Sequence, residues 1–240
     1  MDVLNIKTVF LIKIAGCSVP VTETVLVSWL VMAILIAGSL ILTRQMKLIP
    51  RGPQAILEAA IEFLNKFAKE QFGSVSKQLG PYIGTLFLFL LLLNIIPVLS
   101  PLDIRIFGRE FEPPFSIRTP TRDLNLTAGL AIVSIFLLLV SGFAARGVKG
   151  WFKHLLYPLP IMLPFNLIEY GTRLVSLSLR LFGNMLGGFV VMRLVEGVFP
   201  IALPMIFSLY FDFFDGLIQA AIFVFLSSLY ISEAVKVHAD

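Results

Sequence analysis

Charge is scarce in this sequence. Only 19 Lys and Arg and 15 Asp and Glu occur among its 240 residues, while 58% of the chain is hydrophobic. Because soluble proteins need about one-quarter charged residues to cover a water-exposed surface, this composition excludes a soluble enzyme, a disordered chain and a coiled coil. The basic residues are scattered between apolar blocks, so the net charge of +4 indicates basic loops at a membrane and no nucleic-acid partner.

Reactive and metal-binding side chains are equally rare. The single cysteine, Cys17, excludes an internal disulfide framework and a cysteine-based metal site. The two histidines, His154 and His238, lie at the edges of apolar segments, whereas an intramembrane protease needs a nucleophile and base, or a metal, inside the spans. The chain also lacks a glycine-rich phosphate loop, so we expect no nucleotide or other cofactor.

Long uncharged windows are what the sequence has instead. Three of them cover residues 24–43, 78–102 and 124–145. Each is long enough for one bilayer crossing at about 20 residues, and none shows the alternating polarity of a membrane β-barrel. We therefore predict a transmembrane helix in each window.

The segments between these windows have different compositions. Lys7 and Lys13 interrupt the apolar start, which favours an N-terminal tail at 1–20 over a signal peptide. Apolar residues recur at three- and four-residue steps through 53–78 and predict an amphipathic helix, which lies on the membrane surface or docks a partner subunit. Residues 103–123 are polar and proline-rich, so we predict an irregular loop outside the lipid.

The final third combines apolar length with charge. A turn near Phe199, Pro200 and Pro204 divides the apolar residues 160–236 into two helices of about 35 and 32 residues, each about 50 Å long against a hydrocarbon core of about 30 Å. Such helices must tilt strongly or lie along another membrane protein. The sequence thus predicts an all-α integral membrane protein with about five transmembrane helices, the last two a long, strongly tilted hairpin, plus one amphipathic helix.

The distribution of basic residues predicts the orientation. Six lie in the loop after residue 43 and three in the loop after residue 145, whereas the four arginines of 103–123 are accompanied by four acidic residues. This distribution places the first two loops in the cytoplasm, the N-terminus outside and the C-terminus in the cytoplasm. We divide the chain into four regions on this basis. They are a tail (1–20), two spans with the amphipathic helix and an outer loop (21–123), a third span with a cytoplasmic loop (124–158), and the hairpin (159–240).

Polar residues of the hairpin share two helical stripes. At about 100° per residue, the members of the first stripe fall within about 60° of one another. The members of the second are spaced by three and four residues. The first stripe holds Glu169, Arg173, Arg180 and Asn184, and the second holds Asp212, Asp215 and Gln219.

An arginine within a membrane is costly unless it faces water, a carboxylate or a partner. One interpretation is a buried pair of Arg180 with Asp212 or Asp215 that only locks the hairpin, although such pairs stabilise poorly. The other is an ion pathway, in which carboxylates and amides form wet half-channels around a fixed cation. Gly183 and Gly187, with Gly188 adjacent, allow another helix to approach closely, either from a partner or within the hairpin.

Residues 176–188, SLSLRLFGNMLGG, resemble subunit a of the F-type ATP synthase, whose signature is S-L-x-L-R-L-[FY]-[GA]-N. Residues 218–226, IQAAIFVFL, with Leu229 and Tyr230 following, are similar to the family's last helix. Weaker matches are PFNLIE at 164–169, NIIP at 94–97 and PTRDLN at 120–125.

This resemblance implies a non-catalytic, ion-translocating stator subunit of the ATP synthase. Its partners would be the ring of c subunits, the peripheral-stalk b subunits, other ATP synthase subunits and membrane lipid. The implied location is an energy-transducing membrane, such as the bacterial plasma (inner) membrane. Whether the ion is H⁺ or Na⁺ depends in this family on ligands in the ring, so both remain open.

The resemblance also implies roles for individual residues. Arg180 would be the essential arginine, with Asn184 beside it toward one half-channel and Gln219 as the partner amide. Glu169, with Arg173 on the same stripe, would line the cytoplasmic-side access path. The glycines at 183, 187 and 188 would pack on the ring.

One position departs from the family pattern. Nine residues after the arginine the family commonly carries an acidic residue or histidine, and this chain has Phe189. The facing position, seven residues before the glutamine, is Asp212. We therefore predict that the channel carboxylate has moved from one helix to the other.

A secondary transporter or channel acting alone is the main alternative. It predicts an internal repeat with discontinuous helices around a midplane site. The sequence shows no convincing repeat, and its one unusual hairpin argues against this alternative.

Overall fold

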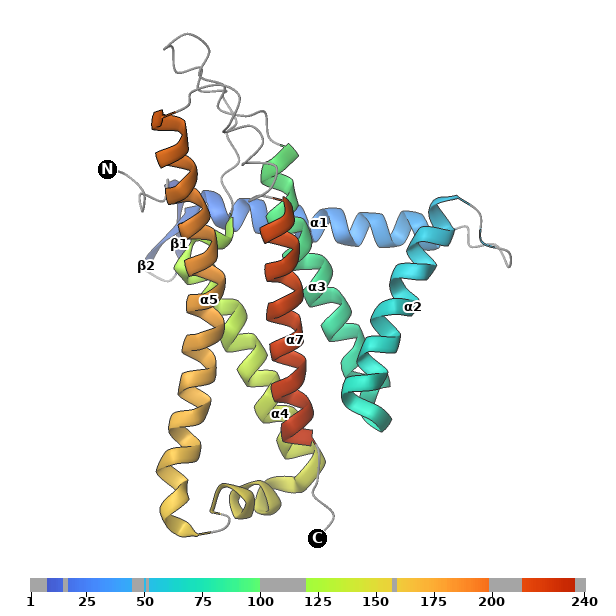
Figure 1. Ribbon diagram of the computed structural model, residues 1–240, viewed down its shortest axis with the longest axis vertical. Helices are drawn as coiled ribbons and strands as arrows, with labels where there is room; N and C mark the ends of the chain where they lie inside the picture. The colour runs from blue at the N-terminus through green and yellow to red at the C-terminus, as the bar shows by residue number, and fades with distance from the viewer. Residues whose placement is uncertain are drawn as a thin grey trace. The chain divides into compact units, whose positions relative to one another are not determined.

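The computed structural model describes residues 8–14, 17–44, 50, 52–99, 120–156, 159–198 and 213–235. Among these residues, five helical segments are long and apolar enough to cross a membrane. This confirms the predicted all-α membrane fold. In chain order the elements are β1 (Thr8–Ile14), β2 (Cys17–Thr22), α1 (Glu23–Thr43), α2 (Pro53–Phe72), η1 (Gly73–Val75), α3 (Ser76–Leu99), η2 (Pro120–Arg122), α4 (Leu124–Leu156), η3 (Pro160–Met162), α5 (Leu163–Val198) and α7 (Gly216–Val235) (Figure 1).

The described residues of the three uncharged windows form helices. They correspond to α1, α3 and the first part of α4, because an apolar segment in lipid must satisfy its backbone hydrogen bonds internally. α4 continues past the window and is interrupted at Gly147, whose backbone has φ 69° and ψ 164°. Glycine lacks the Cβ atom that disfavours this conformation, so Gly147 changes the course of the helix.

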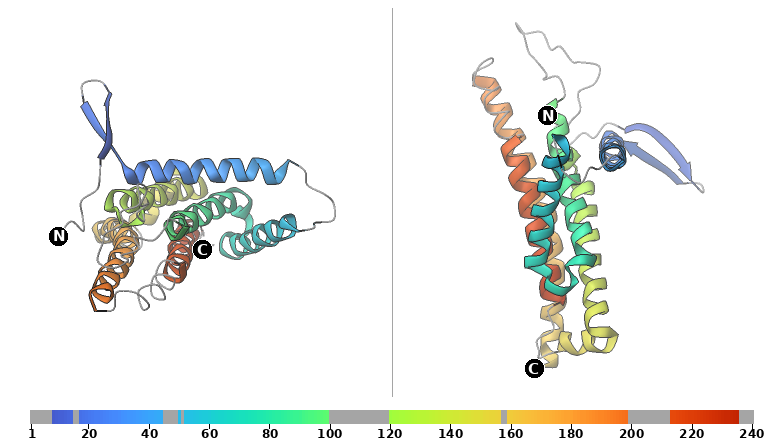
Figure 2. Two further views of the ribbon diagram at one scale, coloured as in Figure 1. Left: turned by 90° about the horizontal axis from the view of Figure 1, so that it is seen from above. Right: turned by 90° about the vertical axis from the view of Figure 1, so that its right-hand side faces the viewer.

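The chain before α1 contains structure that the sequence analysis did not predict. β1 and β2 form an antiparallel hairpin in which Leu11 pairs with Pro20 and Ile14 with Cys17 (Figure 2). The strands are rich in Val, Ile and Thr, the β-branched residues that favour extended backbone. The hairpin ends where α1 begins, at Glu23.

The amphipathic helix is shorter than predicted. α2 begins at Pro53 and ends at Phe72, before the expected end at residue 78, because Gly73 adopts a φ of 57° that ends the helix. α2 packs on α3, and a Cβ atom built at Gly80 would lie 3.3 Å from the Cβ of Ala68. Part of its apolar face is therefore covered within the chain.

The chain forms two compact units. Unit 1 comprises residues 1–49, 88–126 and 182–220, and unit 2 comprises 50–87, 127–181 and 221–240. In unit 1, α1 crosses the C-terminal part of α3 (Figures 1 and 2). The core there is formed by Val27, Val31, Leu93 and Ile96, with Leu35, Phe89, Leu92 and Leu126 packed against it.

Unit 2 has an apolar core crossed by hydroxyl contacts. Its most deeply buried side chains include Ile83, Leu138, Leu177, Phe223 and Ile231. Tyr82 Oη lies 3.1 Å from Ser134 Oγ, and Ser227 Oγ lies 3.5 Å from the same atom. These hydroxyls join α3, α4 and α7, as interhelical hydrogen bonds do in membrane proteins where the hydrophobic effect cannot hold helices together.

Candidate functional site

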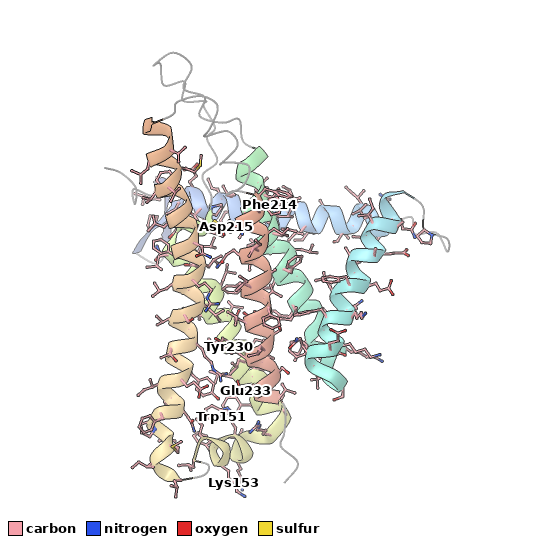
Figure 3. The ribbon with its side chains drawn as sticks, viewed as in Figure 1. Trp151, Lys153, Phe214, Asp215, Tyr230 and Glu233 are labelled. Atoms are coloured by element: carbon pink, nitrogen blue, oxygen red, sulfur yellow. The ribbon has the colours of Figure 1, made fainter. Side chains whose placement is uncertain are left out.

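In unit 2, Arg173 on α5 binds two carboxylates. It forms an ion pair with Glu169 one turn earlier on α5, and its Nη2 lies 2.8 Å from Oε2 of Glu233 on α7. Its guanidinium also lies 4.7 Å from the ring centroid of Tyr230, so a cation–π contact adds to the ion pairs. Tyr230 and Glu233 lie along the C-terminal turns of α7 (Figure 3).

The Arg173 side chain is 13% exposed, whereas the side chains of Glu169 and Glu233 are more than half exposed. Exposed ion pairs contribute only about 0–1 kcal/mol each. The arrangement therefore fixes the position of the arginine and adds little stability.

A small pocket adjoins this cluster. It encloses about 70 Å³, enough for a few water molecules at most. Asn166 forms part of its wall and donates from Nδ2 to the Leu155 carbonyl at 2.8 Å. Its lining residues are Arg146, Trp151, Leu155, Asn166, Glu169, Tyr170, Arg173, Glu233 and Ala234.

In unit 1, the two predicted amides meet. Asn184 Nδ2 on α5 donates to Gln219 Oε1 on α7 at 2.6 Å. Gln219 is 1% exposed, and its Nε2 has no hydrogen-bond partner among the described residues. A buried amide donor without a partner is costly, so this atom marks a place where water or another acceptor is needed.

Arg180 lies on α5 within the candidate span Leu163–Met192. The buried face of this helix includes Leu177, Ser178 and Leu181, while Arg180 is exposed. Arg180 forms no hydrogen bond or ion pair with the described residues of unit 2. The predicted stripe therefore divides, because Arg173 is held within the chain and Arg180 projects away from the buried face.

The glycine face of α5 is open. No described atom lies within 4 Å of a Cβ built at Gly183 or Gly187, and both residues are exposed, while Gly188 is partly buried. The described residues of the hairpin do not pack against Gly183 and Gly187. This leaves the small-residue face open to a helix of another chain.

The structure describes one of the two predicted aspartates, Asp215. Asp215 lies in a π turn at 213–215, immediately before α7, and is partly buried (Figure 3). It makes no hydrogen bond or ion pair with the other described residues of unit 1. Asp212 lies outside the described residues, so its pairing with Arg180 and its place opposite Phe189 stay predictions.

Sequence reasoning missed several residues that the structure brings to these contacts. Glu233 could have been found as an acidic residue near the end of an apolar helix that also faces an arginine-bearing helix. Asn94 and Thr121, which lie in the weaker family matches at 94–97 and 120–125, meet Gly216 in unit 1 through hydrogen bonds from Asn94 Nδ2 to the Gly216 carbonyl and from Thr121 Oγ1 to Asn94 Oδ1. Gly216 carries no signal in the sequence. Among the described residues, no group of three or more His, Cys, Asp or Glu side chains could hold a metal ion.

Comparison with known proteins adds to this geometry. Residues 25–232 match the family described as ATP synthase A chain. The chain is 37% identical over 219 residues to a protein of Propionigenium modestum named ATP synthase subunit a, sodium ion specific, covering 90% of this chain and 75% of that one. It is 34% identical over 223 residues to the ATP synthase subunit a of Moorella thermoacetica, covering 92% of this chain and 94% of that one. These matches confirm the resemblance, and the chain belongs to the ATP synthase A chain family, a membrane-embedded, non-catalytic and ion-translocating component of the synthase.

Proposed function

We propose that this chain is the stator subunit that provides two half-channels to a rotating ring of c subunits, and that peripheral-stalk b subunits hold it in place. The observation that carries the proposal is the environment of the Arg180 side chain. It lies in a candidate span, is exposed, and forms no hydrogen bond or ion pair with the described residues of its own unit. A charge inside a membrane requires water or a carboxylate, and a ring carboxylate supplies one from another chain.

The open glycine face supports the same partner. Gly183 lies three residues after Arg180, and Gly187 lies one turn further along α5. Small residues let helix backbones approach closely in a membrane. A ring helix seated on Gly183, Gly187 and Gly188 brings its carboxylate within reach of Arg180.

The mechanism is electrostatic. An ion enters from the outer side past Asp212, Asp215 and Gln219, and neutralises a ring carboxylate. The neutral site then turns through lipid, which an ionised carboxylate cannot enter cheaply. After nearly a full turn the ion leaves by the inner path near Glu169 and Arg173.

Arg180 separates the two paths in this mechanism. Its fixed positive charge attracts the emptied carboxylate and repels ions that would otherwise pass directly between the half-channels. Asn184, one turn away, links this position to the buried amide of Gln219. Each elementary charge that crosses about 100 mV releases about 2.3 kcal/mol, so several ions must pass for each ATP.

Location and partner contacts follow from the same proposal. We place the chain in a bacterial plasma membrane with its N-terminus outside and its C-terminus in the cytoplasm, and keep the four regions proposed from the sequence. Ile56 and Phe63 on α2 are strongly exposed. These apolar side chains suit either the membrane surface or a docked subunit.

Reconstitution of the complete synthase in lipid vesicles tests this function. With this chain present, we expect an imposed ion gradient and membrane potential to drive ATP synthesis. Separate arms with a pH gradient and with a Na⁺ gradient identify the ion, since one relative is named sodium ion specific. A complex lacking this chain should show no gradient-driven synthesis. Equal synthesis with and without the chain would contradict the proposal.

The displaced carboxylate has its own prediction. We expect Asp212→Asn to lower ion-driven ATP synthesis by about tenfold or more, because a neutral amide cannot pass a proton or bind a cation as a carboxylate does. Asp215→Asn removes the other predicted carboxylate, three residues further along the chain, and is measured beside it. ATP synthesis rates of the assembled complex measure both. If both variants keep the parent rate, the carboxylate has not moved to this helix.

A further inference from the structure

A buried side chain of unit 1 joins three elements near the start of α7. Asn94 on α3 is 0% exposed, and its Nδ2 donates to the Gly216 carbonyl at 3.0 Å. Thr121, also buried in η2, donates from Oγ1 to Asn94 Oδ1 at 2.9 Å. Both ends of the amide are therefore bonded, which fixes its orientation because a buried polar group is costly when left unpaired.

The Asn94 side chain lies so close to Gly216 that a larger residue would not fit there without a shift. A Cβ atom at this position would lie 2.8 Å from the Cβ of Asn94, closer than two carbon atoms can approach without a shift. Gly216 directly follows the π turn at 213–215. Such single wide turns are rare and occur frequently at functional sites.

Asn94, the residue that bonds Gly216, is itself held by Thr121. Thr121 lies in η2, which is closed by the Asp123 N–H donating to the Pro120 carbonyl at 3.0 Å. Asp123 Oδ1 then accepts from the Asn125 N–H at 2.9 Å and caps α4. The Asn94 amide is thus held by a capped helix start, so it is a fixed point for the first turn of α7.

Gln219 follows Gly216 by three residues in α7. The buried Gln219 side chain accepts the 2.6 Å hydrogen bond from Asn184. The rise and rotation per residue are fixed in a helix, so the axial position and rotation of the first turn determine those of the next. Asn94, which bonds Gly216, therefore also sets where the Gln219 amide lies.

We propose that Asn94 is a positioning residue for ion translocation, which holds the first turn of α7 so that the Gln219 amide meets Asn184. This inference rests on the function proposed above. Asn94 itself contacts no ion in this role. It acts through Gly216, and Thr121 orients its amide.

Proximity of the two amide positions tests the inference directly. In the complete synthase with Cys17→Ser, the pair Asn184→Cys and Gln219→Cys is cross-linked with a short bifunctional thiol reagent. Adding Asn94→Leu, which has nearly the same shape and no hydrogen-bonding groups, should lower the cross-linking yield. The matched pair is Arg173→Cys and Glu233→Cys, which joins the same two helices in unit 2. Its yield should not change.

Activity is the second readout. We expect Asn94→Leu and Gly216→Ala each to lower ion-driven ATP synthesis by about tenfold, as for loss of one buried hydrogen bond or a backbone displacement. Ser28→Ala is the control, since Ser28 is a buried polar residue of unit 1 whose hydroxyl, among the described residues, bonds to the Thr24 carbonyl of its own helix. Should Asn94→Leu not accumulate in membranes, Thr121→Val replaces it in both measurements.

The outcomes separate the two proposals. An unchanged yield at positions 184 and 219, an equal fall in both pairs, or parent activity in the Asn94 variant would overturn the positioning role. In each case the function proposed above still stands if Arg180→Ala abolishes synthesis. If Arg180→Ala is also harmless, the proposed function itself fails.

Discussion

Arg180→Ala is expected to abolish ion-driven ATP synthesis, with a fall of about 100-fold or more in the rate of the assembled complex. Alanine removes the fixed charge that attracts the emptied ring carboxylate, so the carboxylate keeps its ion and rotation stops. Without the charge, ions can also pass between the half-channels and dissipate the gradient. Synthesis rates and passive ion leak in vesicles measure the two effects separately.

Two controls sharpen this result. Arg180→Lys keeps the charge but loses the planar, forked donor geometry, so we expect an intermediate rate with little leak. Arg44→Ala removes a basic residue that lies after the end of α1, outside the span Glu23–Thr43, and should stay within about twofold of the parent. An Arg180→Ala complex that synthesises ATP at the parent rate would refute the proposed role of this residue.

Exchange of the two amides is expected to restore what either single change removes. Asn184→Gln lengthens one side chain and Gln219→Asn shortens the other, and the parent amides meet at 2.6 Å. Each single variant should therefore lower ion-driven ATP synthesis by about tenfold, because one overfills the contact and the other opens it. The double variant keeps the summed side-chain length and should recover most of the rate.

A double-mutant cycle on synthesis rates provides the measurement. Residues in contact show coupling of about 0.5–3 kcal/mol, whereas independent sites add. The matched cycle uses Tyr82→Phe and Ser134→Ala, which remove a hydroxyl contact of unit 2 without touching the proposed ion pathway. A swap variant slower than the slower single variant would show that the amide contact has no part in translocation.

The membrane fold could be predicted from the sequence because the free-energy cost of placing a segment in lipid depends mainly on the residues of that segment. A window of about 20 residues without charge can span the bilayer by itself, whereas a charge inside a span needs water or a partner. The described residues of the windows at 24–43, 78–102 and 124–145 therefore lie in α1, α3 and the first part of α4. The end of α2 was not readable in this way, because the helical pattern continues beyond the glycine that ends it.

The candidate site could be predicted in part. Periodicity placed Asn184 and Gln219 on stripes of two antiparallel helices, and the structure joins them. The same periodicity put Arg173 and Arg180 within about 20° of each other, yet Arg173 binds two carboxylates and Arg180 binds none among the described residues of its unit. A helical wheel gives the direction of a side chain but not what lies in that direction.

Taken by itself, the sequence determined that the chain is an all-α membrane protein, that three long windows exclude charge while the final hairpin carries it within apolar segments, and that Arg180 lies in the family's signature. Composition and short-range spacing carry these conclusions, because they depend on residues close together in the chain. Only the tertiary structure decided which polar groups satisfy one another. Glu233 reaches Arg173 across 60 residues, and Asn94 reaches the Gly216 carbonyl across 122. Such pairs depend on how helices meet, and in lipid a buried polar group must find its partner there because water is absent.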